Sequence, residues 1–307
     1  MKVLGIESTA HTFGVGVMDG KEVLSNEREM LRPKEGGIIP REAMEFQVEK
    51  GFDIYSRALE KAGIREEELE LVAFARGPGI APCLRTGAIA ARLISGRLGI
   101  PLLGVNHCIA HIEIGKLAAG FGDPVTLYVS GGNTQIIALE EGRYRIFGET
   151  LDIAIGKCID HFARKAGLAF PGGPKVEELA KKGKLVKLPY VVKGMDFSYS
   201  GMLTAAVRLL EKEKLEDVCY SLQEYAFAML VEATERAIAH TEKKECLLTG
   251  GVAANKRLQG MLKVMCGERQ PEVTFAELIR MMVDADLKRV RRELADEDAA
   301  HIHRNSR

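Results

Sequence analysis

Two histidines, His107 and His111, are the first residues whose types and spacing could do chemistry. They stand four positions apart in a stretch that predicts a helix, directly after Asn106, which suits an N-cap. Residues i and i+4 lie on one face of a helix, so two neutral imidazoles here could bind one zinc or iron ion. Two buried histidines satisfied by backbone carbonyls have the same spacing, so the pair alone leaves both interpretations open.

A glycine-rich turn at residues 130–134, Ser-Gly-Gly-Asn-Thr, follows a strand expected at 126–129. Residues 126–147 repeat the plan of residues 3–26, which is a strand, a turn of small and hydroxyl-bearing residues, a second strand, a tight turn and a third strand. This repetition indicates two related lobes. Backbone N–H groups in such turns can bind phosphate oxygens, although each turn taken alone is more often an ordinary hairpin.

A third candidate nucleotide turn is the Gly-rich segment 249–255, which follows a short expected strand. Its glycines also suit simple packing of a helix on a sheet, so this signal is weak by itself.

The second half also contains candidate ligand residues on expected helices. Asp160 could face a ligand or pair with Arg164 one turn later. Gly172 and Gly173 permit close approach of a ligand to the backbone, and Glu177 lies near the start of the helix that follows. A carboxylate is favoured at that place with or without a ligand.

The elements that position these residues alternate between strands and helices, which indicates an α/β architecture. We expect a first lobe at residues 1–115, a second lobe with a helical insertion at 116–270, and an atypical charged tail at 271–307.

Lys+Arg and Asp+Glu are both 43, so any contact with nucleic acid must come from a local patch or a partner. Six cysteines without C-x-x-C spacing indicate reduced thiols in a cytoplasmic protein, and no apolar run approaches the ~20 residues of a membrane span.

Several ordered motifs together resemble one known family, and they span residue 1 to about residue 270. These motifs are Gly5-Ile6-Glu7-Ser8-Thr9-Ala10-His11-Thr12, Asn106-His107-Cys108-Ile109-Ala110-His111, Tyr128-Val129-Ser130-Gly131-Gly132-Asn133-Thr134, Phe170-Pro171-Gly172-Gly173-Pro174 and Gly250-Gly251-Val252-Ala253-Ala254-Asn255. The chain resembles the archaeal and eukaryotic form of the TsaD-like family, the catalytic subunit of the KEOPS complex, formerly described as an O-sialoglycoprotein endopeptidase. The resemblance implies the two-lobed actin-like ATPase fold, shared with sugar kinases and heat-shock ATPases, with an interlobe cleft.

The resemblance also implies an activity and its partners. The family transfers a threonylcarbamoyl group from threonylcarbamoyl-AMP to adenosine 37 of tRNAs that decode ANN codons. The implied ligands are one iron or zinc ion per chain and an adenine nucleotide. The implied partners are tRNA and other KEOPS subunits, including a small protein kinase and a small dimerising subunit, with no membrane.

By the same resemblance, His107 and His111 would hold the metal, with Tyr128 beside the metal or the acyl group. The acyl-adenylate would lie on the backbone of Val129, Ser130, Gly131 and Gly132. The adenosine would be held by Asp160, Gly173, Glu177 and Asn255. No side chain is assigned as a general base.

Two departures from the family pattern stand out. Phe46 and Gln47 stand where members usually carry a histidine. After residue 270 the family's Asp-Asn-Gly turn, whose aspartate completes the metal site, is not recognisable. Asp284 falls at about the matching distance from Asn255 but lacks the Asn-Gly that makes the turn. We therefore expect the chain to be truncated, frame-shifted or fused at about residue 270.

Two other functions are weighed against the transferase. A nucleotide-binding scaffold of the same complex, with impaired turnover, is favoured by the altered tail. A sugar or acid kinase of the same fold is disfavoured because such kinases hold Mg²⁺ through oxygen ligands rather than histidines. Peptidase activity has little support because H-x-x-x-H lacks the glutamate of H-E-x-x-H.

Overall fold

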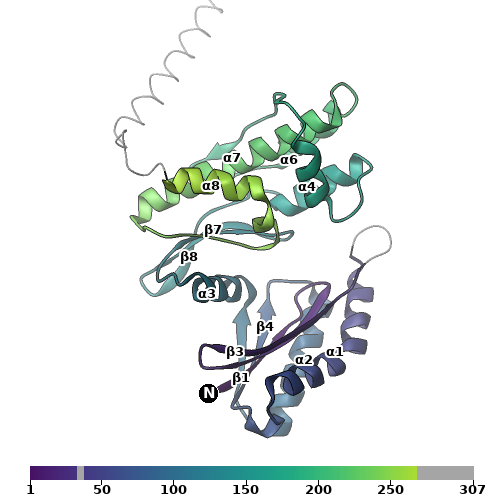
Figure 1. The fold of residues 1–307 in the computed structure, drawn as a ribbon, viewed down its shortest axis with the longest axis vertical. Coiled ribbons are helices and arrows are strands. Elements are labelled where there is room, and N and C mark those ends of the chain that lie inside the picture. The colour runs from purple at the N-terminus through teal and green to yellow at the C-terminus, as the bar shows by residue number, and fades with distance from the viewer. Residues whose placement is uncertain (33–37, 268–307) are drawn as a thin grey trace, which may run out of the picture. The chain divides into compact units, whose positions relative to one another are not determined.

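The computed structural model of the chain describes residues 1–32 and 38–267, and residues 1–262 form one compact unit. Its first sheet has five strands in the order β3 (Glu22–Met30), β2 (Thr12–Asp19), β1 (Lys2–Glu7), β4 (Leu71–Gly77) and β5 (Leu102–Asn106) (Figure 1). The first three strands are antiparallel neighbours, whereas β1, β4 and β5 run parallel. The carboxyl ends of β1, β4 and β5 therefore lie at one edge of the sheet.

Two helices cover this sheet. Helix α1 (Pro40–Ala62) packs on β2 and β3, and α2 (Ala81–Leu98) packs on β4 and on α1. Each has proline in its first turn and ends at a glycine with positive φ, Gly63 and Gly99, as sequence rules for helix ends expect. The 3₁₀ turn η1 (Glu66–Glu68) leads into β4.

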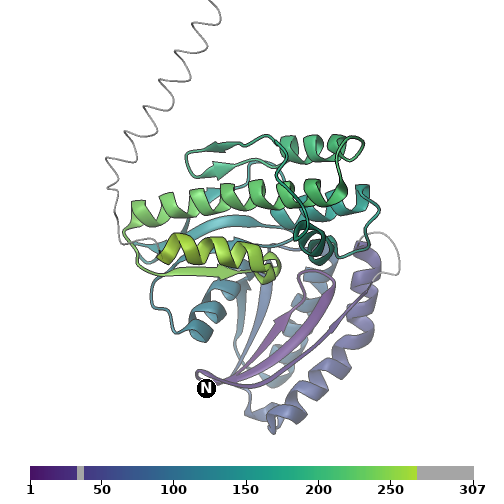
Figure 2. The ribbon, with the colours of Figure 1, turned by 45° about the horizontal axis from the view of Figure 1, so that its top comes forward.

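The second sheet has the order β11 (Cys246–Thr249), β6 (Val125–Val129), β7 (Thr134–Glu140) and β8 (Arg143–Glu149). Its helical side contains α4 (Ile155–Lys165), α5 (Gly172–Ala180), α6 (Ser200–Leu209) and the long α7 (Leu215–Thr241), and a short hairpin joins β9 (Val192–Lys193) to β10 (Asp196–Phe197). The turn η2 (Gly251–Ala254) leads from β11 into α8 (Lys256–Gly267) (Figure 2). Helix α7 is the central element because its buried residues pack on the sheet and on α5.

The second sheet repeats the topology of four strands of the first, as the prediction of two related lobes expects. In the first, an antiparallel meander β1–β2–β3 is extended by the parallel strand β4 beside β1. In the second, the meander β6–β7–β8 is extended by the parallel strand β11 beside β6. This duplicated topology agrees with the actin-like ATPase fold that the resemblance implied.

Helix α3 (His107–Ala119) contacts both sheets, through β4 and β5 on one side and β11 and β6 on the other. Within the described ranges, no helix combines the length and apolar character needed to cross a membrane.

Candidate metal and nucleotide site

The histidine-bearing helix α3 is held by an N-terminal cap and by the packing of its buried face. The side-chain oxygen of Asn106 accepts hydrogen bonds from the backbone N–H groups of Cys108 (2.9 Å) and Ile109 (3.3 Å), which confirms the predicted N-cap. On its buried face, Cys108 and Ile112 form a core cluster with Tyr128 and two apolar neighbours from the second sheet. This packing fixes the rotation of the helix and therefore the direction in which its histidines point.

The two histidines lie against each other, and His111 also lies against Tyr128, the next-to-last residue of β6. The ring centroids of His107 and His111 are 4.6 Å apart with the ring planes at 89°, and those of His111 and Tyr128 are 5.3 Å apart. Nδ1 of His107 lies 3.0 Å from Oε2 of Glu7. The structure therefore brings the sequence-predicted metal residues together.

His107 and His111 offer imidazole nitrogens, which are common ligands of zinc and iron, and Tyr128 and Glu7 lie beside them. Across residues 1–32 and 38–267, no group of three or more His, Cys, Asp or Glu side chains is placed to hold a metal ion. The candidate third ligand Asp284 lies outside the described residues. The described residues therefore supply two histidines to a metal site, and a third acidic ligand is not among them.

Burial sets the protonation of this cluster. Burial lowers the pKa of His111, and the neighbouring His107 lowers it further, so His111 is neutral at neutral pH, the form that binds metals. Burial raises the pKa of Tyr128, so its phenol stays protonated. Burial would raise the pKa of Glu7, but hydrogen bonds from His107 and Thr9 outweigh it and the pKa lies below its usual value.

The turn after β6 is closed by hydrogen bonds of its own. The Ser130 N–H donates to the Asn133 carbonyl (2.8 Å), and Ser130 Oγ accepts from the N–H groups of Gly132 (3.2 Å) and Asn133 (2.9 Å). A Cβ on Gly131 or Gly132 would meet nothing within 4 Å, so this side of the turn is open. A phosphate bound here would face small residues and would compete with Ser130 Oγ for two of the amides.

Two further glycines allow the neighbouring elements to approach this turn. The N–H of Gly156 in α4 donates to the Ser130 carbonyl (3.2 Å), and a Cβ there would lie 2.8 Å from that oxygen. At Gly250, whose φ is 99°, a Cβ would lie 2.2 Å from the Val129 carbonyl oxygen. Only glycine fits at either contact.

The predicted adenosine residues lie at two junctions between helices of the second half. The Asp160 carboxylate binds a backbone amide rather than pairing with Arg164 one helical turn later. Its Oδ1 accepts a hydrogen bond from the Gly172 N–H (2.8 Å). Burial raises the pKa of this carboxyl, and the amides of Gly172 and Gly173 oppose that effect. A Cβ on Gly173 would meet nothing within 4 Å, so the backbone is open at this position.

Asn255 and Glu177 meet at the start of α8. The Asn255 oxygen accepts from the N–H groups of Arg257 (2.9 Å) and Leu258 (3.2 Å), and its amide donates to Gln223 Oε1 (2.9 Å). Glu177 Oε1 accepts from the Lys256 N–H (2.7 Å). Both predicted ligand residues therefore also hold α8 in place.

Sequence reasoning missed Glu7, Gly156 and Gln223 as residues of this region. Gln47, which replaces the family's usual histidine, is fully buried and donates to the carbonyls of Ala10 (2.7 Å) and Thr12 (3.2 Å). It therefore supports the turn between β1 and β2, which directly follows Glu7.

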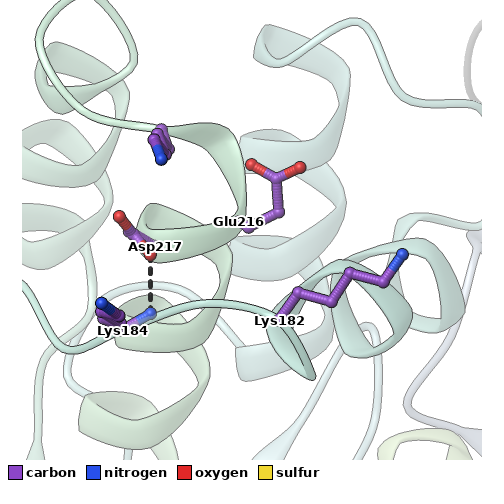
Figure 3. Close-up of a pocket in the computed structure, with 5 residues that line it drawn as sticks. Lys182, Lys184, Glu216 and Asp217 are labelled. Carbon is purple, nitrogen blue, oxygen red and sulfur yellow. Dashed lines mark hydrogen bonds between the residues drawn. The ribbon is translucent and has the colours of Figure 1, made fainter.

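A separate pocket of about 320 Å³ lies where the segment after α5 meets the start of α7 (Figure 3). Lys182, Lys184, Lys214, Glu216 and Asp217 line it, and Asp217 Oδ1 accepts from the Lys184 N–H (2.6 Å). Its lining carries both charges and includes none of the predicted site residues.

The fold and the site together define a two-lobed protein of the actin-like ATPase class with a histidine pair beside a glycine-rich turn. Solved structures support this class: HypF from T. kodakarensis has a TM-score of 0.63 at 14% identity over 87% of this chain and 44% of that one. Component A of (R)-2-hydroxyglutaryl-CoA dehydratase from Acidaminococcus fermentans has a TM-score of 0.54 at 14% identity over 87% of this chain and 89% of that one. At such identities the likeness shows the fold alone.

The sequence profile of the TsaD family, described as tRNA N6-adenosine threonylcarbamoyltransferase, matches residues 21–283, and the chain belongs to this family. A protein of that name from Thermococcus kodakarensis is 56% identical over 272 residues, covering 88% of this chain and 83% of that protein. One from Archaeoglobus fulgidus is 56% identical over 271 residues, with 88% and 83% covered. A probable bifunctional tRNA threonylcarbamoyladenosine biosynthesis protein from Methanobrevibacter smithii is 54% identical over 277 residues, covering 90% of this chain but only 52% of that protein.

Proposed function

We propose that this chain transfers the threonylcarbamoyl group of threonylcarbamoyl-AMP to the exocyclic amine of adenosine 37 in tRNAs that decode ANN codons. The observation that carries the proposal is the contact of His111 with Tyr128, whose ring centroids are 5.3 Å apart. Tyr128 lies two residues before Ser130, so this contact joins the histidine pair to the glycine-rich turn. Metal donors and phosphate-binding amides then meet at the place where an acyl phosphate would be cleaved.

In the reaction, the amine nitrogen of adenosine attacks the carbamoyl carbon, AMP leaves with the bonding electron pair, and the amine loses a proton. His107 and His111, with Tyr128, would hold the metal ion, which when bound supplies Lewis-acid polarisation of a carbonyl or phosphate oxygen. The Gly131 amide, and the Gly132 amide once it is released from Ser130 Oγ, would donate to the phosphate and the developing oxyanion. Catalysis then depends mainly on holding the adenosine amine and the carbamoyl carbon close together in the orientation that allows attack.

The adenosine of the donor is assigned to the junctions of α5 with α4 and α8. Glu177 uses one carboxylate oxygen to bind a backbone N–H group, which leaves its second oxygen for a ribose hydroxyl. Asp160, which accepts from the Gly172 N–H, is the other carboxylate assigned to the ribose. The open backbone at Gly173 admits the ring of the nucleoside. Asn255 holds the start of α8 beside them.

We also propose that the chain acts in the cytoplasm as a subunit of a KEOPS-type complex, with a small protein kinase and a small dimerising subunit, and that its metal is iron or zinc. Large apolar side chains exposed on the adjacent helices α1 and α2 support protein partners. Phe52 is 75% exposed and Leu93 68%. Exposed apolar side chains grouped in this way are a feature of surfaces that bind other proteins.

The test is to incubate the metal-loaded chain with threonylcarbamoyl-AMP, partner subunits and tRNA, and to measure threonylcarbamoyladenosine by mass spectrometry. The T. kodakarensis relative serves as the positive control. We expect modified adenosine only with the complete mixture. No product under conditions where the control works would refute the transferase.

The second candidate, a scaffold without turnover, is favoured by one observation: the described residues supply no third acidic metal ligand. If the chain binds the nucleotide but transfers no threonylcarbamoyl group, and adding the partner subunits does not change this, the scaffold function is supported.

A further inference from the structure

Glu7 and His107 are 100 positions apart in the sequence, but the first sheet brings them to one edge. Glu7 is the last residue of β1, and His107 directly follows β5. Strand β4 lies between β1 and β5, and all three are parallel, so their carboxyl ends meet there. In α/β sheets this edge is where ligands bind.

The Glu7 carboxylate uses each oxygen for a different N–H group. Oε1 accepts from the Thr9 backbone N–H (2.7 Å), and Oε2 lies 3.0 Å from His107 Nδ1. A carboxylate accepts hydrogen bonds, so in the neutral imidazole this contact places the proton on Nδ1 and leaves the lone pair of Nε2 free.

The backbone that carries Glu7 is itself held firmly. The Ile80 N–H donates to the Thr9 carbonyl (2.7 Å), and a Cβ on Gly79 would lie 2.5 Å from that oxygen. Gln47 donates to the Ala10 carbonyl (2.7 Å) from the other side. Glu7 therefore presents its carboxylate to His107 from a turn that two other elements support.

We propose that Glu7 is a positioning residue that holds His107 in the Nδ1–H tautomer and presents Nε2 to the metal ion. Metal-binding histidines commonly donate their second ring N–H to a carboxylate, and loss of that partner typically lowers metal affinity 10–100-fold. The inference rests on the proposed metal role of His107 and adds a residue that lies outside the ligand set.

The test variant is Glu7→Gln, which keeps the side-chain volume but has one acceptor oxygen for two N–H donors. Long-range ¹H–¹⁵N NMR of the metal-free chain reports the His107 tautomer, and a Co²⁺ titration followed by visible absorption reports metal affinity. We expect the Nδ1–H tautomer to dominate in the wild type and to decline in Glu7→Gln, with Co²⁺ affinity lowered about 10–100-fold. Glu22→Gln, an exposed residue at the start of β3, is the matched control and should change neither quantity.

Wild-type tautomer and Co²⁺ affinity in a folded Glu7→Gln protein would overturn the proposal. Weaker Co²⁺ binding with an unchanged tautomer would also overturn it, because Glu7 would then act as a direct ligand. A wild-type chain that binds no Co²⁺ would refute the metal part of the proposed function. The tautomer in wild type and variant would still decide the role of Glu7.

Discussion

The Glu177 carboxylate accepts a hydrogen bond from the backbone N–H of Lys256, with 2.7 Å between Oε1 and the nitrogen. Lys256 is the first residue of α8, so a side chain of α5 satisfies an amide that has no partner within its own helix. A negative charge at this end of a helix is also favoured by the helix dipole. Glu177 is predicted to bind a ribose hydroxyl with one carboxylate oxygen. Its other oxygen, Oε1, stabilises the start of α8.

Glu177→Ala should weaken nucleotide binding and destabilise the fold together. Hydrogen bonds to charged groups contribute about 1.5–3 kcal/mol, so the affinity for AMP should fall at least about tenfold. Isothermal titration calorimetry with AMP and urea unfolding would measure the two effects. Glu178→Ala is the control because Glu178 is exposed and pairs with Lys181. Lower stability with unchanged AMP affinity would leave Glu177 only its structural role.

Replacing either histidine should remove the metal without removing the nucleotide site. His107→Ala and His111→Ala should each abolish stoichiometric metal in elemental analysis, because two imidazoles on one helix face act as a pair. AMP affinity should stay within about threefold, a change of about 0.6 kcal/mol, since the adenosine residues lie on other elements. His240→Ala, beside Phe147, is the control and should retain metal. Unchanged metal content in both site variants would contradict the assignment.

Gly156→Ala should disturb the glycine-rich turn through a steric contact. The new Cβ would lie 2.8 Å from the Ser130 carbonyl oxygen and 2.9 Å from Gly131 Cα. Forcing backbone apart in this way costs about 1–3 kcal/mol, and AMP affinity should decrease because the turn shifts. Gly260→Ala in α8, where a Cβ meets nothing within 4 Å, should instead stabilise the fold by about 0.5–1 kcal/mol. Thermal unfolding and AMP titration of both variants would measure these effects. Wild-type stability and AMP affinity in Gly156→Ala would contradict a tight contact between Gly156 and the turn at Ser130.

Local sequence patterns predict the elements of this fold well. The alternation of apolar residues and the turn signals place both meanders, and Asn106 before His107 indicates the cap that the structure contains. These features depend on residues a few positions apart. The bond between Glu7 and His107 depends instead on three parallel strands, which no local pattern encodes.

The same limit applies to the carboxylates of the second lobe. Spacing offers Asp160 a partner one helical turn away, Arg164, but its carboxylate accepts a hydrogen bond from the Gly172 N–H beyond the end of its helix. Carboxylates can accept from any exposed amide, so their partners follow from tertiary packing rather than spacing.

Asp152 offers a pH-dependent test of such a long-range contact. Its Oδ2 accepts from the N–H (2.9 Å) and hydroxyl (2.6 Å) of Ser200, the first residue of α6, and its Oδ1 accepts from the Tyr199 N–H (2.9 Å). Asp152 thus caps α6 from 48 positions away, where Tyr199 supplies no side-chain cap. Partial burial would raise the pKa of Asp152, but these donors outweigh it and hold the pKa below its usual value of 3.8.

Asp152→Asn should lower the free energy of unfolding at neutral pH by about 1 kcal/mol, the usual contribution of a helix cap, because the amide NH₂ cannot accept from Ser200. A carboxyl whose pKa is lower in the folded state stabilises the fold above its unfolded pKa, and this contribution is lost as pH falls through the folded value. The difference between wild type and variant should therefore be full at pH 6–7 and shrink below about pH 4. Urea unfolding across this range measures it, with Asp53→Asn on the exposed side of α1 as control. A difference that stays constant with pH would show that the charge of Asp152 does not contribute to the cap.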